Sequence, residues 1–137
     1  MHLCHHGHLM GQSVDGNEAG RTQIYVMNAD GSNLIQMTDY HINTWDGGPV
    51  WCPDDSCLIF LRDTGTRKIM ILDMENKSIA PLFPSTFGSK DMLLLKQSSS
   101  MRYITFVVDG EGFAFDIIDK ELYSLDIPYV LSLSLYP

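Results

Sequence analysis

The chain reads Ile24-Tyr25-Val26-Met27-Asn28-Ala29-Asp30-Gly31 near its beginning, an apolar-alternating run that ends in an acidic turn. The same pattern returns twice, as IMILDMEN at 69–76 and as FAFDIID at 113–119. Alternation with period two predicts half-buried β-strands, and Ile, Val, Tyr and Phe favour the pleated surface of a sheet. Asp30-Gly31 supplies residues that accept the backbone geometry of a tight hairpin turn. The run therefore predicts a β-hairpin that occurs three times.

The spacing of these runs indicates a repeat architecture. Aligning Asn28, Asp73 and Asp116 gives intervals of 45 and 43 residues, and no segment of ten or more residues shows a helical apolar stripe. Repeats of about 40–45 residues with several short strands are typical of β-propeller blades. We predict an all-β chain of about three antiparallel four-stranded blades, which is an incomplete β-propeller. The expected divisions are blade 1 at approximately 2–38, blade 2 at 48–83, blade 3 at 91–126 and an extra strand at 129–136.

Two motifs resemble those of a known family. Residues 24–34, IYVMNADGSNL, resemble a strand pair of TolB-like propellers with WD40-like (PD40) repeats, and 49–55, PVWCPDD, resemble that family's PxWSPDG motif. Asp55 stands where the motif has Gly, and 97–100 reads QSSS where the third repeat would carry Trp-Ser-Pro-Asp. The resemblance is specific over residues 22–73. It implies a closed ring of six or seven blades that serves as a platform for protein interactions.

The motif residues are expected to build structure rather than to perform chemistry. We expect Trp51 to pack in the core or between blades, since a side chain of that size stabilises strongly when buried. Asp30, Gly31, Pro53 and Asp54 are interpreted as turn formers, because Asp side chains accept hydrogen bonds from their own turns. The sequence therefore predicts no catalytic residue among them.

Composition narrows the classes of partner. The net charge is −8, from 17 acidic and 9 basic residues with no basic run, so we expect no binding to nucleic acid. No apolar run is long enough for a membrane helix, and the first residues lack the pattern of a signal peptide, which together predict a cytoplasmic protein. Three cysteines in a reducing compartment argue against a disulfide, although Cys52 and Cys57 flank a predicted turn.

Four of the five histidines lie in the first eight residues, and they are the only candidates for a metal site. His5, His6 and His8, beside Cys4, are weak candidate ligands, since imidazole and thiolate suit zinc. This stretch also faintly resembles a segment of oligogalacturonate lyases, which are TolB-like propellers with a metal held by histidines. Only His41 remains to complete such a cage, so we expect no metal and no cofactor.

These observations favour a non-catalytic propeller segment that acts as a protein-interaction module. The alternative is a truncated relative of a propeller enzyme, similar either to oligogalacturonate lyase or to the propeller of prolyl-oligopeptidase-type hydrolases. The chain has no GxSxG nucleophile motif. Three blades do not close a ring, so the chain is expected to be a fragment of a longer product, a degenerate remnant or half of a homodimer. In the homodimer, two copies would give a six-bladed ring and would associate through residues 2–14 and 129–136, with the strand at 129–136 of one copy completing the first blade of the other.

Overall fold

The computed structural model describes residues 7–13 and 22–126, and within them it contains strands and no helix. The eleven strands are β1 (Gly7–Ser13), β2 (Thr22–Asn28), β3 (Ile35–Gln36), β4 (Trp45–Trp51), β5 (Cys57–Asp63), β6 (Arg67–Asp73), β7 (Ile79–Pro81), β8 (Met92–Gln97), β9 (Tyr103–Val108), β10 (Glu111–Asp116) and β11 (Glu121–Ser124). The described residues thus include no helix of the length and apolarity that a membrane crossing would need.

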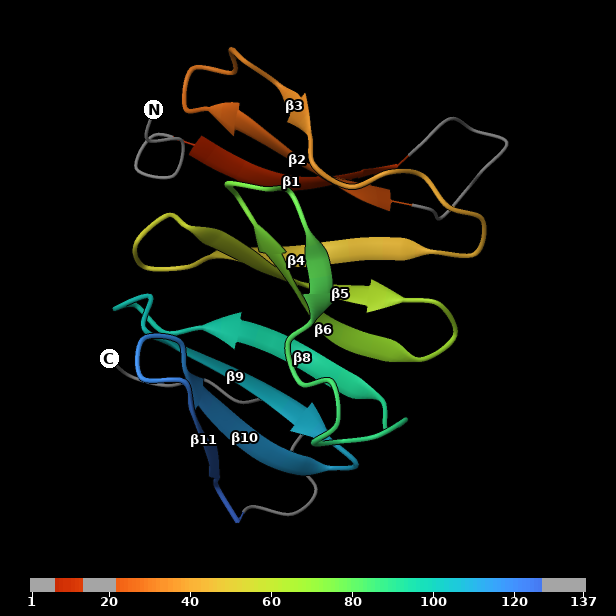
Figure 1. Ribbon diagram of the computed structural model, residues 1–137, viewed down its shortest axis with the longest axis vertical. Helices are drawn as coiled ribbons and strands as arrows, with labels where there is room; N and C mark the ends of the chain where they lie inside the picture. The colour runs from red at the N-terminus through yellow and green to blue at the C-terminus, as the bar shows by residue number, and fades with distance from the viewer. Residues whose placement is uncertain (1–6, 14–21, 127–137) are drawn as a thin grey trace.

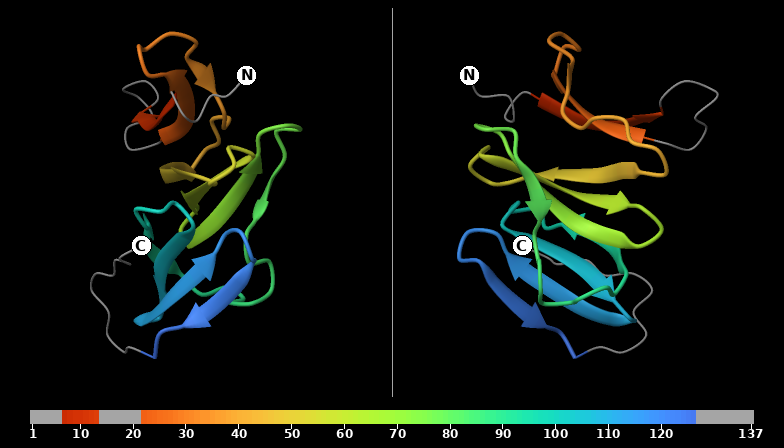
Figure 2. Two further views of the ribbon diagram at one scale, coloured as in Figure 1. Left: turned by 90° about the vertical axis from the view of Figure 1, so that its left-hand side faces the viewer. Right: turned by 45° about the vertical axis from the view of Figure 1, so that its right-hand side comes forward.

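The strands form three antiparallel sheets that lie one above another (Figure 1). The first sheet has the order β1-β2-β3, the second β4-β5-β6-β7 and the third β11-β10-β9-β8. Each is a meander in which consecutive strands pair, as expected for propeller blades. Two further views show the same stacking from other sides (Figure 2). The all-β architecture predicted from the repeat is confirmed.

Alternation along β5 explains how the middle sheet packs on both of its neighbours. Leu58 and Phe60, both fully buried, belong to a core shared with Ile24 and Val26 of the first sheet. Their sequence neighbour Ile59 points the other way, into a second core with the third sheet. Successive residues of a strand face opposite sides, so a run that is apolar throughout suits a sheet covered on both faces.

Aromatic side chains dominate the core between the second and third sheets. Phe83 lies with its ring centroid 5.2 Å from that of Phe106 and 5.2 Å from that of Phe115. Phe87 contacts the same group, 5.0 Å from Phe113 in an edge-on geometry. Such pairs add to the free energy gained from area burial. Phe83 and Phe87 come from the β7–β8 connection, which therefore helps to join the two sheets.

The first strand of the second sheet begins earlier than the predicted residue 48. β4 starts at Trp45 and pairs with β5 on both sides of a bulge between Gly47 and Val50. Gly48 has a φ of 60°, a conformation that Gly adopts without steric cost. The Gly-Gly-Pro sequence resembles a strand boundary, yet here it kinks one continuous strand. The earliest strand, expected within 2–14, is β1, while the strand expected at 129–136 lies outside the described residues.

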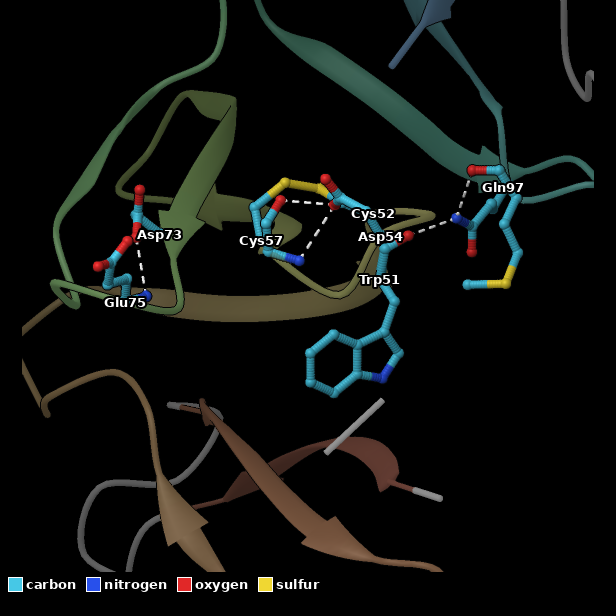
Figure 3. The surroundings of a disulfide bond; sticks show 9 residues. Trp51, Cys52, Asp54, Cys57, Asp73, Glu75 and Gln97 are labelled. Atoms are coloured by element: carbon cyan, nitrogen blue, oxygen red, sulfur yellow. Dashed lines mark hydrogen bonds between the residues drawn. A yellow bond between two sulfur atoms is a disulfide. The ribbon is translucent and has the colours of Figure 1, made fainter. Parts of the chain in front are cut away.

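The expectation of reduced cysteines was wrong. Cys52 and Cys57 form a disulfide across the β4–β5 turn, with their Cα atoms 5.2 Å apart (Figure 3). The Cys52 N–H also donates to the Cys57 carbonyl at 2.9 Å, so the two residues face each other at the end of the ladder. The expectation of reduced cysteines rested on the predicted cellular compartment alone. The register of the hairpin decides the geometry, and it places both side chains within bonding range.

Candidate functional site

Exposed apolar side chains gather in one short segment of the described structure. Four of its six exposed large hydrophobic residues fall between positions 34 and 42, namely Leu34 (54%), Ile35 (38%), Tyr40 (37%) and Ile42 (71%). We call residues 34–42 the 34–42 surface. Single exposed apolar residues are ordinary, but four of them within nine positions single out this segment as the candidate site. The segment covers β3 and the connection from the first sheet to the second.

Buried anchors hold this segment against the first sheet. The Met37 N–H donates to the Ile24 carbonyl at 2.8 Å, and the Ile24 N–H donates to the Thr38 hydroxyl oxygen at 2.9 Å. Thr38 is 1% exposed. These bonds continue the β2–β3 ladder after β3 ends, so the backbone keeps its polar groups satisfied. The apolar side chains before and after Thr38 remain exposed to solvent.

A cavity of about 330 Å³ lies beside the 34–42 surface, between β3 and β7. It is lined by residues of both sheets: Ile35, Gln36, Met37, Asp39, His41, Arg62, Lys77 and Ile79. The hollow is small for a cofactor, yet it has room for one or two side chains of a partner. Its lining combines apolar side chains with charges of both signs.

Arg62 is the fixed charge of this cavity. Its guanidinium binds the Asp46 carboxylate twice, Nε to Oδ1 at 2.7 Å and Nη2 to Oδ2 at 2.9 Å, and lies 5.5 Å from the centroid of the Phe60 ring. The Asp46 side chain is 1% exposed. A two-point pair of this kind sets the orientation of the guanidinium. The pair fixes Arg62 within the fold, and Lys77 and Asp39 supply the other charges of the cavity lining.

Hydrogen bonds lower the pKa values of three carboxylates in the described structure. Hydrogen bonds from Ser56 lower the pKa of Asp54, and those from Arg67 and Arg102 lower the pKa values of Asp91 and Asp116 respectively. A general acid or base works best with a pKa near the operating pH, which requires a shift in the opposite direction. No group of three or more His, Cys, Asp or Glu side chains within the described ranges is placed to hold a metal ion.

The predicted motif residue Asp30 lies in the turn between β2 and β3. Its Oδ1 accepts from the Ser32 N–H at 2.9 Å and from the Ser32 hydroxyl at 2.6 Å, and these bonds lower the pKa of Asp30. Gly31 follows with a φ of 86°, in the region that favours Gly. Both residues shape the hairpin that leads to the 34–42 surface, and neither faces its cavity.

The second motif lies in the turn between β4 and β5. Trp51 is 7% exposed and packs in the core between the first two sheets, where its indole N–H has no hydrogen-bond partner among the described residues. Asp54 repeats the geometry of Asp30, since its Oδ1 accepts from the Ser56 N–H at 3.1 Å and from the Ser56 hydroxyl at 2.6 Å. Pro53 lines a separate cavity on this side of the molecule.

The histidines are not brought together by the described structure. His5 and His6 lie outside the described residues, and His8 is a β1 residue whose side chain is not described. His41 lies in the 34–42 surface and lines its cavity. The candidate ligands His5, His6 and His8 therefore stay a prediction that the described residues do not test.

Comparison with known proteins places this geometry in a structural class. No family model and no curated protein matches the sequence. The structure superposes on TolB from Acinetobacter baumannii with a TM-score of 0.65 and 24% identity, over 94% of this chain and 31% of that one. The fold is that of a TolB-like β-propeller. A TolB-like protein from Agrobacterium tumefaciens gives a TM-score of 0.64 and 17% identity, over 93% of this chain and 49% of that one.

The TolB-like fold is shared by enzymes as well. A puromycin hydrolase matches with a TM-score of 0.63 and 15% identity, over 95% of this chain and 22% of that one, and oligogalacturonate lyases match too. This chain spans about a third and about half of the length of the two TolB chains. Identities this low show the fold alone.

Sequence reasoning missed the 34–42 surface. Tyr40 and Ile42 lie in a turn-rich stretch outside the predicted strands, and that position was the available signal of exposure. Leu34 falls within a predicted strand, where nothing in the sequence signalled its exposure. The Asp46–Arg62 pair was missed as well, because its two residues come from different strands and only the β4–β5 register brings them opposite each other.

Proposed function

We propose that this TolB-like propeller segment is a non-catalytic module that binds another protein through the 34–42 surface. The observation that carries the proposal is the gathering of four of the six exposed large hydrophobic residues within nine positions. Exposed apolar clusters bordered by polar groups are typical of protein interfaces. The adjoining cavity supplies a place for an anchoring side chain of the partner.

The expected partner surface follows from the chemistry of the cavity. Ile35, Met37 and Ile79 offer apolar contact, while Lys77 and Asp39 border it with opposite charges. An apolar side chain flanked by polar groups would bury its tip there and keep its hydrogen bonds at the rim. Complementary rim charges act mainly on specificity and on association rate.

Site-specific photocrosslinking tests the proposal in cells of the source organism. A photoreactive amino acid at Ile42 should capture one protein, identified by mass spectrometry, and the same group at Ile118 should not. Ile118 is the matched control, because it is 56% exposed but belongs to the β10–β11 turn of the third sheet. Equal capture at both positions would contradict the proposal.

Purified components then test the same surface directly. With the captured protein in hand, Leu34→Asp with Ile42→Asp should weaken binding at least about tenfold, since an interface loses affinity when charge replaces buried apolar contacts. Ile118→Asp should leave the affinity unchanged. Binding that survives the double substitution would move the interface elsewhere.

The alternative function, that of an oligogalacturonate lyase-like enzyme, predicts that the chain binds a metal ion. An oligogalacturonate lyase of this fold has been solved in complex with manganese. Titration of the chain with Mn²⁺ in a calorimeter distinguishes the two functions, because only the lyase function requires a bound divalent ion at one equivalent. No observation in the described part of the chain favours that function over protein binding.

A further inference from the structure

The turn that carries the disulfide occurs a second time in the molecule without one. In the second sheet the Cys52 N–H donates to the Cys57 carbonyl at 2.9 Å, and in the third sheet the Ser98 N–H donates to the Tyr103 carbonyl, also at 2.9 Å. Both turns connect the first two strands of a four-stranded sheet. Comparing the turn of the third sheet with that of the second therefore shows what the covalent bond contributes.

The two turns agree in their interior as well. Asp55 and Met101 occupy the same position, with φ angles of 71° and 66°. The Asp55 N–H donates to the Cys52 carbonyl at 3.1 Å, and the Met101 N–H donates to the Ser98 carbonyl at 2.9 Å. Backbone hydrogen bonds therefore suffice to shape the turn.

Side-chain hydrogen bonds close the turn of the third sheet where the second has sulfur. The Tyr103 N–H donates to the Ser98 hydroxyl oxygen at 3.1 Å, and that oxygen lies 3.0 Å from the Ser100 hydroxyl. A disulfide restricts the unfolded chain least when the loop it closes is short, and Cys52 and Cys57 are separated by only 5 residues. The disulfide is thus not required for the shape of the turn.

The disulfide also borders open space. Both cysteines line a cavity of about 440 Å³, whose other wall is formed by Ile117, Ile118 and Lys120 of the third sheet. Cys57 and Lys120 also line a neighbouring cavity of about 330 Å³. Cys57 is 8% exposed and Cys52 only 1%, so Cys57 is the residue of the pair that a small thiol can reach from these cavities. Figure 3 shows the disulfide at the turn of the β4–β5 hairpin.

One ammonium group and two carboxylates line this space. Lys120 lines both cavities, and its ammonium contributes to the lowered pKa of Asp54 on the cysteine-bearing turn. Asp54 and Asp73 are the acidic groups there, and both carboxylates are engaged by their own turns, with Ser56 and with the N–H groups of Glu75 and Asn76. A nearby cation increases the fraction of thiolate, which is the reactive form.

We propose that Cys52–Cys57 is a redox-active site that exchanges electrons with small thiols at the cavity between the second and third sheets. A thiolate attacks the Cys57 Sγ, the S–S bond breaks, and Cys52 leaves as a thiolate that then takes a proton. A second thiol attacks the mixed disulfide, releasing the oxidised small molecule and the Cys57 thiol. Two electrons and two protons pass from two thiols to the protein, and an oxidised thiol compound reverses the reaction.

The test is reduction of the folded full-length chain with dithiothreitol, followed by alkylation and intact mass measurement. The number of alkylated cysteines should rise by two, while the circular dichroism spectrum and melting temperature stay close to those of the oxidised chain. Cys52→Ser with Cys57→Ser should also fold, because it reproduces the hydroxyl-based closure of the third sheet. A bond that resists reductant until denaturant is added would overturn the proposal, as would loss of the fold on reduction.

Lysine variants test the environment of the site. Lys120→Met should slow reduction about three- to tenfold, and Lys120→Arg should restore the rate, since a single nearby charge changes thiolate stability by that order. Lys77→Met is the matched control. Lys77 has the equivalent position in the β6–β7 turn, with a φ of 63° against 60° for Lys120, but it lines neither of these cavities. Equal rates in Lys120→Met and Lys77→Met would overturn the role of Lys120.

Discussion

Trp51 and Gln97 end the first strands of the second and third sheets, and they illustrate two ways of filling one position. Trp51 places an indole in the core between the first and second sheets. Gln97 instead reaches across to the second sheet, where its Nε2 donates to the Trp51 carbonyl at 2.6 Å and to the Met101 carbonyl at 3.1 Å (Figure 3). One residue contributes burial and the other a hydrogen-bonded bridge between sheets.

Truncating the indole should destabilise the domain strongly. Trp51→Ala is expected to lower the free energy of unfolding by about 3–5 kcal/mol, because a large cavity opens between two sheets. That loss approaches the whole stability of a small domain. Denaturant unfolding followed by circular dichroism measures it. Tyr123→Ala is the control, because Tyr123 is 44% exposed and should cost little.

Trp51→Phe refines this test. Phe retains most of the apolar area and removes an indole N–H that is buried without a partner. We expect a clearly smaller loss than for Ala. If both variants have the melting temperature of the native protein, the indole does not stabilise the core between the first and second sheets.

The Asp116 carboxylate links stability to pH. Its Oδ2 accepts from Arg102 at 2.9 and 2.7 Å, and its Oδ1 accepts from the N–H groups of Ile118 and Asp119. These bonds, led by Arg102, lower the pKa of Asp116 in the folded chain. Since the unfolded value is about 3.9, the stabilisation is present above that pH and is lost as pH falls toward the folded pKa.

Asp116→Asn should therefore be less stable than the native chain at pH 7, and the difference should shrink as the pH falls below about 4. Melting temperatures between pH 7 and pH 3 test this. Glu111→Gln, at an exposed strand position, should leave the profile unchanged. A constant difference across the range would show that Asp116 acts through packing rather than through its charge.

The β6–β7 and β10–β11 turns have the same local structure. Lys77 and Lys120 each donate their N–H to the carbonyl of an Asp four residues earlier, at 2.8 Å, and each adopts a positive φ. This conformation is costly for a residue with a Cβ. Lys77→Gly should raise the free energy of unfolding by about 0.5–1 kcal/mol. Lys77→Ala keeps the Cβ and is expected to give no gain, so a similar gain in both would attribute the effect to the lost charge.

The inner strands were more predictable from sequence than the outer ones. Cys57–Asp63 and Arg67–Asp73 combine apolar runs with a paired strand on each side, so pattern and hydrogen bonding agree. Blade 1 was expected to continue to residue 38, but its last strand is only Ile35–Gln36, although the Met37 N–H still donates to the Ile24 carbonyl. Outer strands pair on one side only, and their apolar pattern continues beyond the regular ladder.

The candidate sites were less accessible to sequence analysis. The identity of an apolar residue such as Leu34 does not reveal whether its side chain is buried or, as here, 54% exposed. The disulfide depends on register and on redox conditions, and the expected compartment pointed the wrong way. The turn-forming roles of Asp30 and Asp54 were accessible, because an Asp bonds its own turn through local geometry that needs no tertiary contact.

The stack of three sheets leaves the ring incomplete within this chain. We propose self-association in which residues 129–136 of each copy complete the three-stranded first sheet of the other, so that two copies form six blades. Native mass at micromolar concentration should then be that of a dimer, and deletion of 129–137 should give a monomer or an aggregate. A full-length chain that remains a monomer at high micromolar concentration would contradict this proposal.

The two-sided burial of β5 has a kinetic consequence. Leu58 and Ile59 are both 0% exposed although they face opposite sheets, so no small displacement brings water to the amides of this strand. Deuterium should enter β5 only when the whole domain opens, whereas β3 and β11 should exchange by fraying at the sheet edges. The isotope pattern would then form a gradient outward from the centre of the stack. Uniform protection across all three sheets would show instead that they open as one unit.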